Sequence, residues 1–240
     1  MLIIYDFISY TDVFTYNITT LESLLIYAMK TITYQSDYLG NGFEFATINQ
    51  PDDYEGKVVA TVIRKQCSMP SNKAVLYVHG FNDYFFQSEM AQKFNEKGFH
   101  FYAVDLRKYG RSTLPHQKSN NMRSLTEYFA DLDEALDIVR QEGNEQVLLS
   151  GHSTGGLLVT LYASERVGNE KFDTIFCNSP FYDMNMPGYQ KRLLVPLVAL
   201  FGKYFPDVLL PGKISEWYGH SLHGEKKGEW DYNLVWKPHL

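Results

Sequence analysis

The feature that most restricts the fold of this 240-residue chain is an alternation of apolar runs with helix-like segments across its middle. Continuous apolar runs are typical of strands that are buried on both faces of a sheet. The expected strands are 73–80, 99–107, 146–150 and 172–181, and the helices expected between them are 87–98, 124–143 and 155–167. Strands that alternate with helices predict an α/β fold with a mostly parallel sheet and helices on both faces.

The segments on either side of this region have a different character. Two strand-like stretches at 43–49 and 57–65, joined by a turn segment with Pro51 and Gly56, predict an antiparallel hairpin. Near the N-terminus, Thr19 and Glu22 form a capping-box pattern that predicts a short helix. We therefore expect three parts, which are an N-terminal extension with a short helix (1–38), an α/β core (39–181) and a helical cap or lid (182–240).

Composition excludes several classes of function. A formal net charge of −6 argues against a nucleic-acid surface, because phosphates require a basic face. Two cysteines are too few for a disulfide scaffold, and no His or Cys spacing is typical of a metal site. No glycine pattern indicates a nucleotide cofactor. The start of the chain has no basic signal-peptide region, and no uncharged apolar run reaches membrane-spanning length. We expect a cytoplasmic protein that needs no cofactor or metal and does not insert stably into membranes.

The segment Val147–Gly156, "VLLSGHSTGG", places a serine between a predicted strand and a predicted helix. A sharp turn there would expose the Ser153 hydroxyl and direct the amino end of the helix at the reacting centre. Such a turn needs small flanking residues, and Gly151, Gly155 and Gly156 supply them. The pattern predicts that Ser153 is a catalytic nucleophile, although a glycine-rich turn without chemistry would look the same.

A second segment supports acyl-transfer chemistry. The strand at 73–79 ends in His79-Gly80, and the loop continues with Phe81. Acyl transfer needs two N–H donors directed at the developing oxyanion. We expect these donors to be the amides of Phe81 and Thr154, with His79 and Gly80 supporting the loop. A strand-end histidine that bonds only to the backbone is the alternative interpretation of His79.

A third segment, "VDLRKYGRS" at 104–112, follows the next predicted strand. Asp105 and Arg107 are spaced so that they could form an ion pair that fixes this loop. We expect structural bracing from these residues rather than catalysis.

Together these segments resemble the α/β-hydrolase superfamily, and more narrowly its monoacylglycerol-lipase and serine-aminopeptidase-like (lysophospholipase-like) branch. The matching motifs are "HG" at His79-Gly80, "D-x-R-x-x-G-x-S" at Asp105–Ser112 and "G-H-S-x-G-G" at Gly151–Gly156, which includes His152. The resemblance covers residues 38–181 and implies a nucleophile elbow and a helical cap after the sixth strand. It also implies a hydrolase that acts on carboxylic esters such as acyl glycerols or lysophospholipids, or in some members on peptides.

The resemblance also implies a catalytic acid and a histidine that follow the serine in the chain. No strands resembling a seventh and an eighth are visible after 181, so the sequence is expected to be truncated before the acid and the histidine. Asp183 could substitute for the acid, and His220, His223 or His239 for the base. A truncated sheet would leave an uncovered edge, where self-association is expected.

Three functions remain open at this point. The first is a serine hydrolase that forms an acyl-enzyme on Ser153 with an ester substrate, whose acyl group would occupy an apolar pocket supplied by the cap. The second is a catalytically incomplete fragment or binding protein. The third is an aminopeptidase-like hydrolase, in which Asp83, Glu89 and Asp183 would hold a substrate ammonium group.

Overall fold

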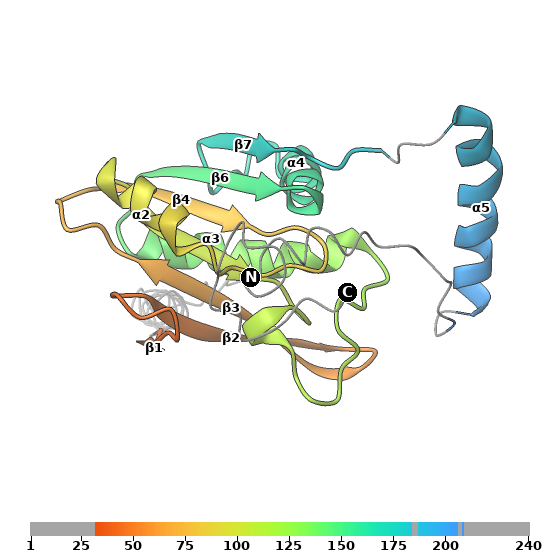
Figure 1. Ribbon diagram of the computed structural model, residues 1–240, viewed down its shortest axis with the longest axis horizontal. Coiled ribbons are helices and arrows are strands. Elements are labelled where there is room, and N and C mark those ends of the chain that lie inside the picture. The colour runs from red at the N-terminus through yellow and green to blue at the C-terminus, as the bar shows by residue number, and fades with distance from the viewer. Residues whose placement is uncertain (1–31, 184–186, 206–207, 209–240) are drawn as a thin grey trace, which may run out of the picture. The chain divides into compact units, whose positions relative to one another are not determined.

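The computed structural model describes residues 32–183, 187–205 and 208 (Figure 1). The chain divides into two units, Met1–Thr33 and Tyr34–Leu240, and the helices and strands described below all belong to the second. The helix predicted at Thr19 and the histidines His220, His223 and His239 lie outside the described residues.

The described part of the chain contains a 7-stranded mixed sheet. Its strands are β1 Gln35–Ser36, β2 Glu44–Asp53, β3 Gly56–Lys65, β4 Lys73–Val78, β5 His100–Asp105, β6 Gln146–His152 and β7 Thr174–Asn178. The spatial order is β1-β2-β3-β5-β4-β6-β7, with parallel pairing among β5, β4, β6 and β7. The predicted α/β fold is confirmed. β1 lies in the segment expected to form an N-terminal extension, but it pairs with β2.

The chain reverses its direction of travel across the sheet at β4. It passes from β4 to β5 on one side and then to β6 on the other side. Ligands of open α/β sheets bind outside the carboxyl ends of the strands at such a switch point. The three motif segments of the sequence follow β4, β5 and β6, so this topology places all three at one edge of the sheet.

The predicted hairpin is confirmed as the antiparallel pair β2 and β3. Its turn is shorter than expected, because β2 continues through Pro51 to Asp53 with a register shift between Gln50 and Asp53. Proline is tolerated at such an irregularity, where it removes no regular ladder bond. Gly56 then has a φ of 93°, a conformation that favours glycine.

Helices cover both faces of the sheet (Figure 1). α2 Ser88–Glu96 packs on one face, where its buried Ala91 joins a cluster with Phe101 and Ala103 of β5. Side chains alternate along a strand, so Tyr102 points to the other face, where its hydroxyl donates to Glu142 at 2.6 Å, just after α3. α3 Phe129–Gln141 and α4 Thr154–Glu165 share that face, with the Phe129 and Tyr162 rings 5.3 Å apart.

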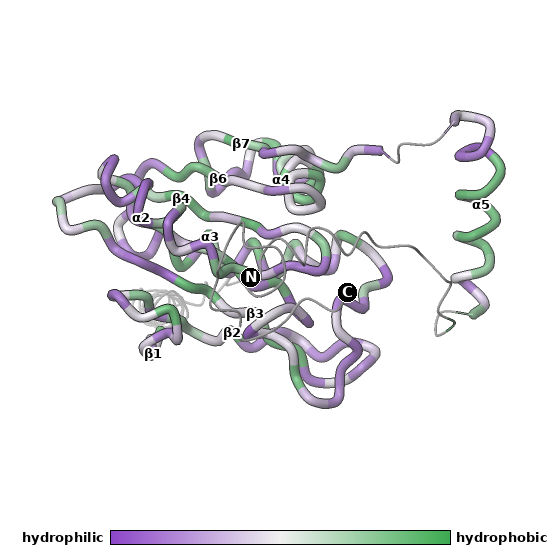
Figure 2. Tube along the Cα trace, in the orientation of Figure 1, coloured by the Kyte–Doolittle hydropathy of each residue, from purple (hydrophilic) through white to green (hydrophobic). Residues whose placement is uncertain are grey.

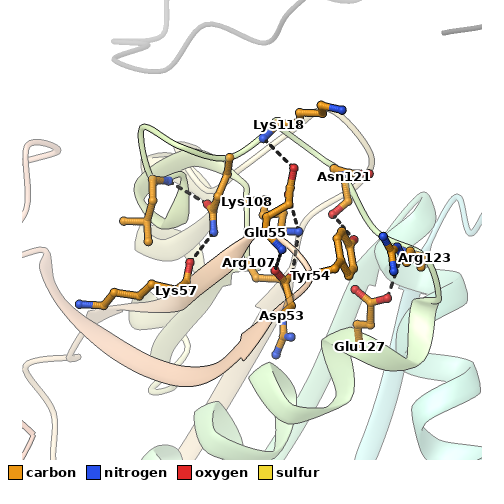
Figure 3. Close-up of polar contacts among 12 residues, drawn as sticks. Asp53, Tyr54, Glu55, Lys57, Arg107, Lys108, Lys118, Asn121, Arg123 and Glu127 are labelled. Carbon is orange, nitrogen blue, oxygen red and sulfur yellow. Dashed lines mark hydrogen bonds and ion pairs between the residues drawn. The ribbon is translucent and has the colours of Figure 1, made fainter. Parts of the chain in front are cut away.

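A buried lysine ties the loop after β5 to the tip of the hairpin. The Lys108 side chain is 1% exposed and its ammonium group lies 2.7 Å from Asp53 and 2.6 Å from Glu55. Its Nζ also lies 4.2 Å from the centre of the Tyr54 ring, and the Tyr54 hydroxyl donates to the carbonyl of Asn121 at 3.0 Å. Figure 3 shows these groups converging from the hairpin and the loop. The hairpin therefore fixes a loop that borders the candidate site.

The predicted cap contributes α5 Gly188–Tyr204, which contains Pro196. Its apolar residues stand out in Figure 2, and none of its side chains is buried. Leu193, Leu197 and Leu200, for example, are between 54 and 64% exposed. A role for this helix in an acyl pocket, and self-association through the sheet edge, stay predictions. Among the described residues, no helix combines the length and the apolar character needed to cross a membrane.

Candidate active site

Ser153 lies at the junction of β6 and α4 in a strained backbone conformation. It is the N-cap of α4 with φ 52° and ψ −118°, which few non-glycine residues adopt. Its N–H donates to the carbonyl of Asn178 at 3.0 Å, and its carbonyl accepts from the N–H of Phe181 at 2.9 Å. The segment after β7 therefore holds the turn in place and leaves the half-buried Ser153 side chain at the carboxyl edge of the sheet.

The glycines around Ser153 are required by close backbone approach. A Cβ on Gly151 would lie 2.4 Å from the carbonyl oxygen of Gly155, and a Cβ on Gly155 would lie 2.4 Å from that of His79. A Cβ on Gly156 would lie 2.7 Å from the Pro180 side chain. Real Cβ contacts are never this short, so a larger residue would push α4 away from β4 and β6.

His79 lies at the end of β4 and joins two loops. Its Nε2 accepts from the N–H of Leu106 at 3.1 Å, so Nδ1 carries the proton and donates to the carbonyl of Gly80 at 2.7 Å. Burial lowers the pKa of His79, which keeps the imidazole neutral. Both ring nitrogens bond to the backbone, so His79 is placed to hold the loop that carries Phe81 against the end of β5.

The two amides expected to act as oxyanion donors come from segments that touch. Phe81 follows Gly80, and a Cβ on Gly80 would lie 3.2 Å from the Cβ of Ser153. Thr154 is the first residue of α4. The N–H of Phe81 donates to the Thr154 hydroxyl oxygen at 2.9 Å. The structure thus brings Phe81 next to Ser153 and Thr154, from which it is far apart in the sequence.

The prediction of an ion pair between Asp105 and Arg107 is wrong. Asp105 instead pairs with Arg111 at 2.8 Å and accepts from the N–H of Phe85 at 2.9 Å. Arg107 pairs with Asp131 of α3 at 2.7 Å. The residues at 105 and 107 are separated by a turn into the loop, so each turns toward a different element. A structural role for Asp105 and Arg107 in bracing the loop still fits, because the carboxylate of Asp105 and that of Asp131, the partner of Arg107, are both fully buried.

A small pocket of about 20 Å³ lies beside these amides, which is room for about one water molecule. Its walls are largely apolar and come from the loops after β4 and β5, the segment before α3 and the first turns of α4. The lining residues are His79, Gly80, Phe81, Leu106, Tyr109, Met122, Leu125, Tyr128, Thr154, Gly155 and Leu158. Sequence reasoning missed Met122 and Tyr128, because no local pattern marks a loop that reaches a distant site.

The acidic residues considered for an ammonium site are not among the residues that line this pocket. Asp83 is 4% exposed and its Oδ1 accepts from the N–H of Tyr84 at 2.8 Å. Glu89 is exposed in the first turn of α2, and Asp183 forms an ion pair with Lys191. Asp83 is therefore an interior residue rather than a residue of the pocket mouth.

His152 precedes the nucleophile, is half-buried, and has its pKa lowered by burial. Of the other described histidines, His100 and His116 bond to backbone atoms remote from Ser153 in the sequence. Within the described residues, no histidine is hydrogen-bonded to the Ser153 hydroxyl.

Comparison with protein-family models matches residues 69–228 to the family described as serine aminopeptidase, S33. No curated protein matches the chain.

Among solved structures, a soluble variant of the monoglyceride lipase of Saccharomyces cerevisiae is 18% identical with a TM-score of 0.53, and the match covers 85% of this chain and 66% of that chain. A monoacylglycerol lipase of Paleococcus ferrophilus is 26% identical with a TM-score of 0.50, over 65% of this chain and 56% of that one. A thermostable carboxyl esterase of Bacillus coagulans, solved with glycerol, is 17% identical with a TM-score of 0.53, over 72% and 61%. The chain thus spans less than two thirds of the length of each of these proteins.

Proposed function

Because this chain belongs to the serine aminopeptidase S33 family and has the α/β-hydrolase fold, we propose that it is a serine hydrolase that cleaves a carboxylic ester through an acyl-enzyme on Ser153. The observation that carries the proposal is the backbone of Ser153, held at φ 52° between β6 and α4, beside the loop that presents the Phe81 amide. Strain of this kind persists where the surrounding structure enforces it, and it concentrates at functional sites.

In the proposed reaction, the Ser153 oxygen attacks the acyl carbonyl while a general base removes its proton. The carbonyl oxygen becomes an oxyanion, which the amides of Phe81 and Thr154 are proposed to stabilise together with the positive end of α4. Collapse of this intermediate expels the alcohol, which takes up the proton, and leaves the acyl group on Ser153. Water then attacks the acyl-enzyme by the same route and releases the acid. The sequence candidates for the base, His220, His223 and His239, lie outside the described residues.

We propose a monoacylglycerol or a lysophospholipid as the substrate class. The walls of the small pocket beside Phe81 and Thr154 are largely apolar, which favours contact with an apolar acyl group over a charged group. The similar solved structures of a monoglyceride lipase, a monoacylglycerol lipase and a carboxyl esterase support the same substrate class. The alternative aminopeptidase activity is consistent with the family description, but none of the three carboxylates expected to hold an ammonium group, Asp83, Glu89 and Asp183, lines this pocket.

A panel of substrates tests the proposal. The protein is expected to hydrolyse p-nitrophenyl butyrate and a monoacylglycerol, and not an aminoacyl p-nitroanilide. Ser153→Ala is expected to lower ester hydrolysis by at least about 1000-fold, because it removes the nucleophile. Ser150→Ala, which changes a buried serine in β6, the strand that leads to Ser153, serves as the matched control. Preferential cleavage of the anilide would favour the aminopeptidase, and no turnover of any substrate would favour a binding protein.

A further inference from the structure

The Phe81 amide is already engaged in this structure. Its N–H donates to the hydroxyl oxygen of Thr154 at 2.9 Å, which joins residues 73 positions apart in the sequence. A full hydrogen bond of this length uses the one hydrogen that the amide offers. There are two ways in which the Phe81 amide could stabilise an oxyanion. Either the hydrogen bond to the Thr154 hydroxyl breaks and the amide donates to the oxyanion directly, or the Thr154 hydroxyl itself donates a hydrogen bond to the oxyanion.

The Thr154 hydroxyl is held in place by the packing of the backbone around it. Thr154 directly follows the nucleophile, and the next residue, Gly155, lies so close to β4 that a Cβ would meet the carbonyl oxygens of Val78 and His79 at 2.5 and 2.4 Å. The start of α4 therefore cannot withdraw from the loop that carries Phe81 without breaking this contact. The bond between Phe81 and Thr154 is a consequence of the same packing that forms the turn at Ser153.

A hydroxyl has one hydrogen to donate and two lone pairs that accept. The Thr154 oxygen accepts from Phe81, and within the described part of the chain its hydrogen is donated to no other group. A substrate oxygen that bonds the Thr154 N–H would lie beside the hydroxyl of the same residue. A hydroxyl that accepts an N–H bond is also polarised and becomes a stronger donor.

On the basis of the proposed function, we propose that the Thr154 side chain is a catalytic donor. Its hydroxyl accepts the Phe81 N–H and donates its own hydrogen to the oxyanion, beside the Thr154 amide. No bond to Thr154 is made or broken, and its hydrogen stays on its oxygen throughout. The Phe81 amide then stabilises the oxyanion through the Thr154 hydroxyl, which it orients and polarises, and not by a direct hydrogen bond.

Threonine-to-valine replacement tests this inference, because it removes the hydroxyl and keeps the shape. Thr154→Val is expected to lower kcat for p-nitrophenyl butyrate by about 100-fold, as for loss of one oxyanion donor, and to change KM by less than about twofold. Thr154→Ser restores a hydroxyl at the same place and is expected to recover most of the lost kcat. Thr160→Val makes the same change later in the same helix, at an exposed residue, and is the matched control.

Melting temperatures of the variants separate this role from a structural one, since all are expected to match the wild-type protein. A Thr154→Val protein with unchanged or higher kcat would overturn the inference while leaving Ser153 as the nucleophile. A loss confined to KM, or an equal loss in Thr160→Val, would overturn it as well. A wild-type protein without esterase activity would overturn both this inference and the proposed function.

Discussion

Replacing Asp131 with alanine is expected to lower the free energy of unfolding by about 3 to 5 kcal/mol, because it leaves a buried guanidinium without its partner. Asp131 is fully buried in α3 and accepts three kinds of bond from Arg107, through Nη2 at 2.7 Å, Nε at 3.1 Å and the backbone N–H at 3.0 Å. Arg107 is 6% exposed and cannot lose its proton, so its charge would stay in the interior unpaired.

Urea unfolding of both proteins at one neutral pH measures this loss. Asp137→Ala is the matched control, since Asp137 lies on the same helix and pairs with Lys171 at 2.7 Å, but its side chain is 44% exposed. An exposed pair contributes at most about 1 kcal/mol. Equal losses in the two variants would show that the Arg107–Asp131 pair does not hold the loop after β5. Combining Asp131→Leu with Arg107→Met is expected to recover most of the loss, because no buried charge then remains.

The buried carboxyl group of Asp83 is expected to make the stability of the wild-type protein fall with rising pH. Burial, together with the charge of nearby Asp105, raises the pKa of Asp83 to about 7, against an ordinary value of 3.8. The Asp83 Oδ2 atom is buried and has no hydrogen-bond partner among the described residues. Between these two pKa values the folded protein holds a proton that the unfolded chain has released, so each unit of pH costs about 1.4 kcal/mol. The loss ends above about pH 7, where both states are ionised.

Asp83→Asn removes this titration, and its stability is compared with wild type by urea unfolding at about pH 5 and about pH 8. The difference between the two proteins is expected to move by about 3 kcal/mol in favour of the variant as the pH rises. Asp52→Asn, at an exposed position in β2, controls for the loss of one negative charge. A difference that is independent of pH would show that the Asp83 carboxyl ionises in the folded protein as it does in the unfolded chain.

Much of the fold follows from local patterns. The apolar runs that became β4, β5 and β6 are buried along most of their length, as is typical of parallel strands covered on both faces, whereas β7 is largely exposed. The turn at Ser153 was also visible, because the need for small residues on both sides of it is a local steric rule. The helix expected at 124–143 begins as a 3-10 turn at Leu125–Tyr128, capped by Ser124 and Glu127, and becomes α3 at Phe129.

Partner choice could not be predicted in the same way. Asp105 and Arg107 are close in sequence, and yet Arg111 and Asp131 are their partners. Those pairings depend on how α3 and the loop after β5 lie on the sheet, which no short window encodes. The short strand β1 has only two residues and depends on its pairing with β2. The bond between Phe81 and Thr154 likewise exists only once β4 and α4 meet.

The most direct test of Ser153 as the nucleophile is its reaction with a fluorophosphonate, read by mass spectrometry of the intact protein and of its peptides. A nucleophile at a strained turn beside oxyanion donors is expected to take up one equivalent of the probe, located on Ser153, and the Ser153→Ala protein is expected to take up none. Absence of probe from Ser153 in the folded wild-type protein, or equal uptake by Ser153→Ala, would contradict the assignment of acyl-transfer chemistry to this turn.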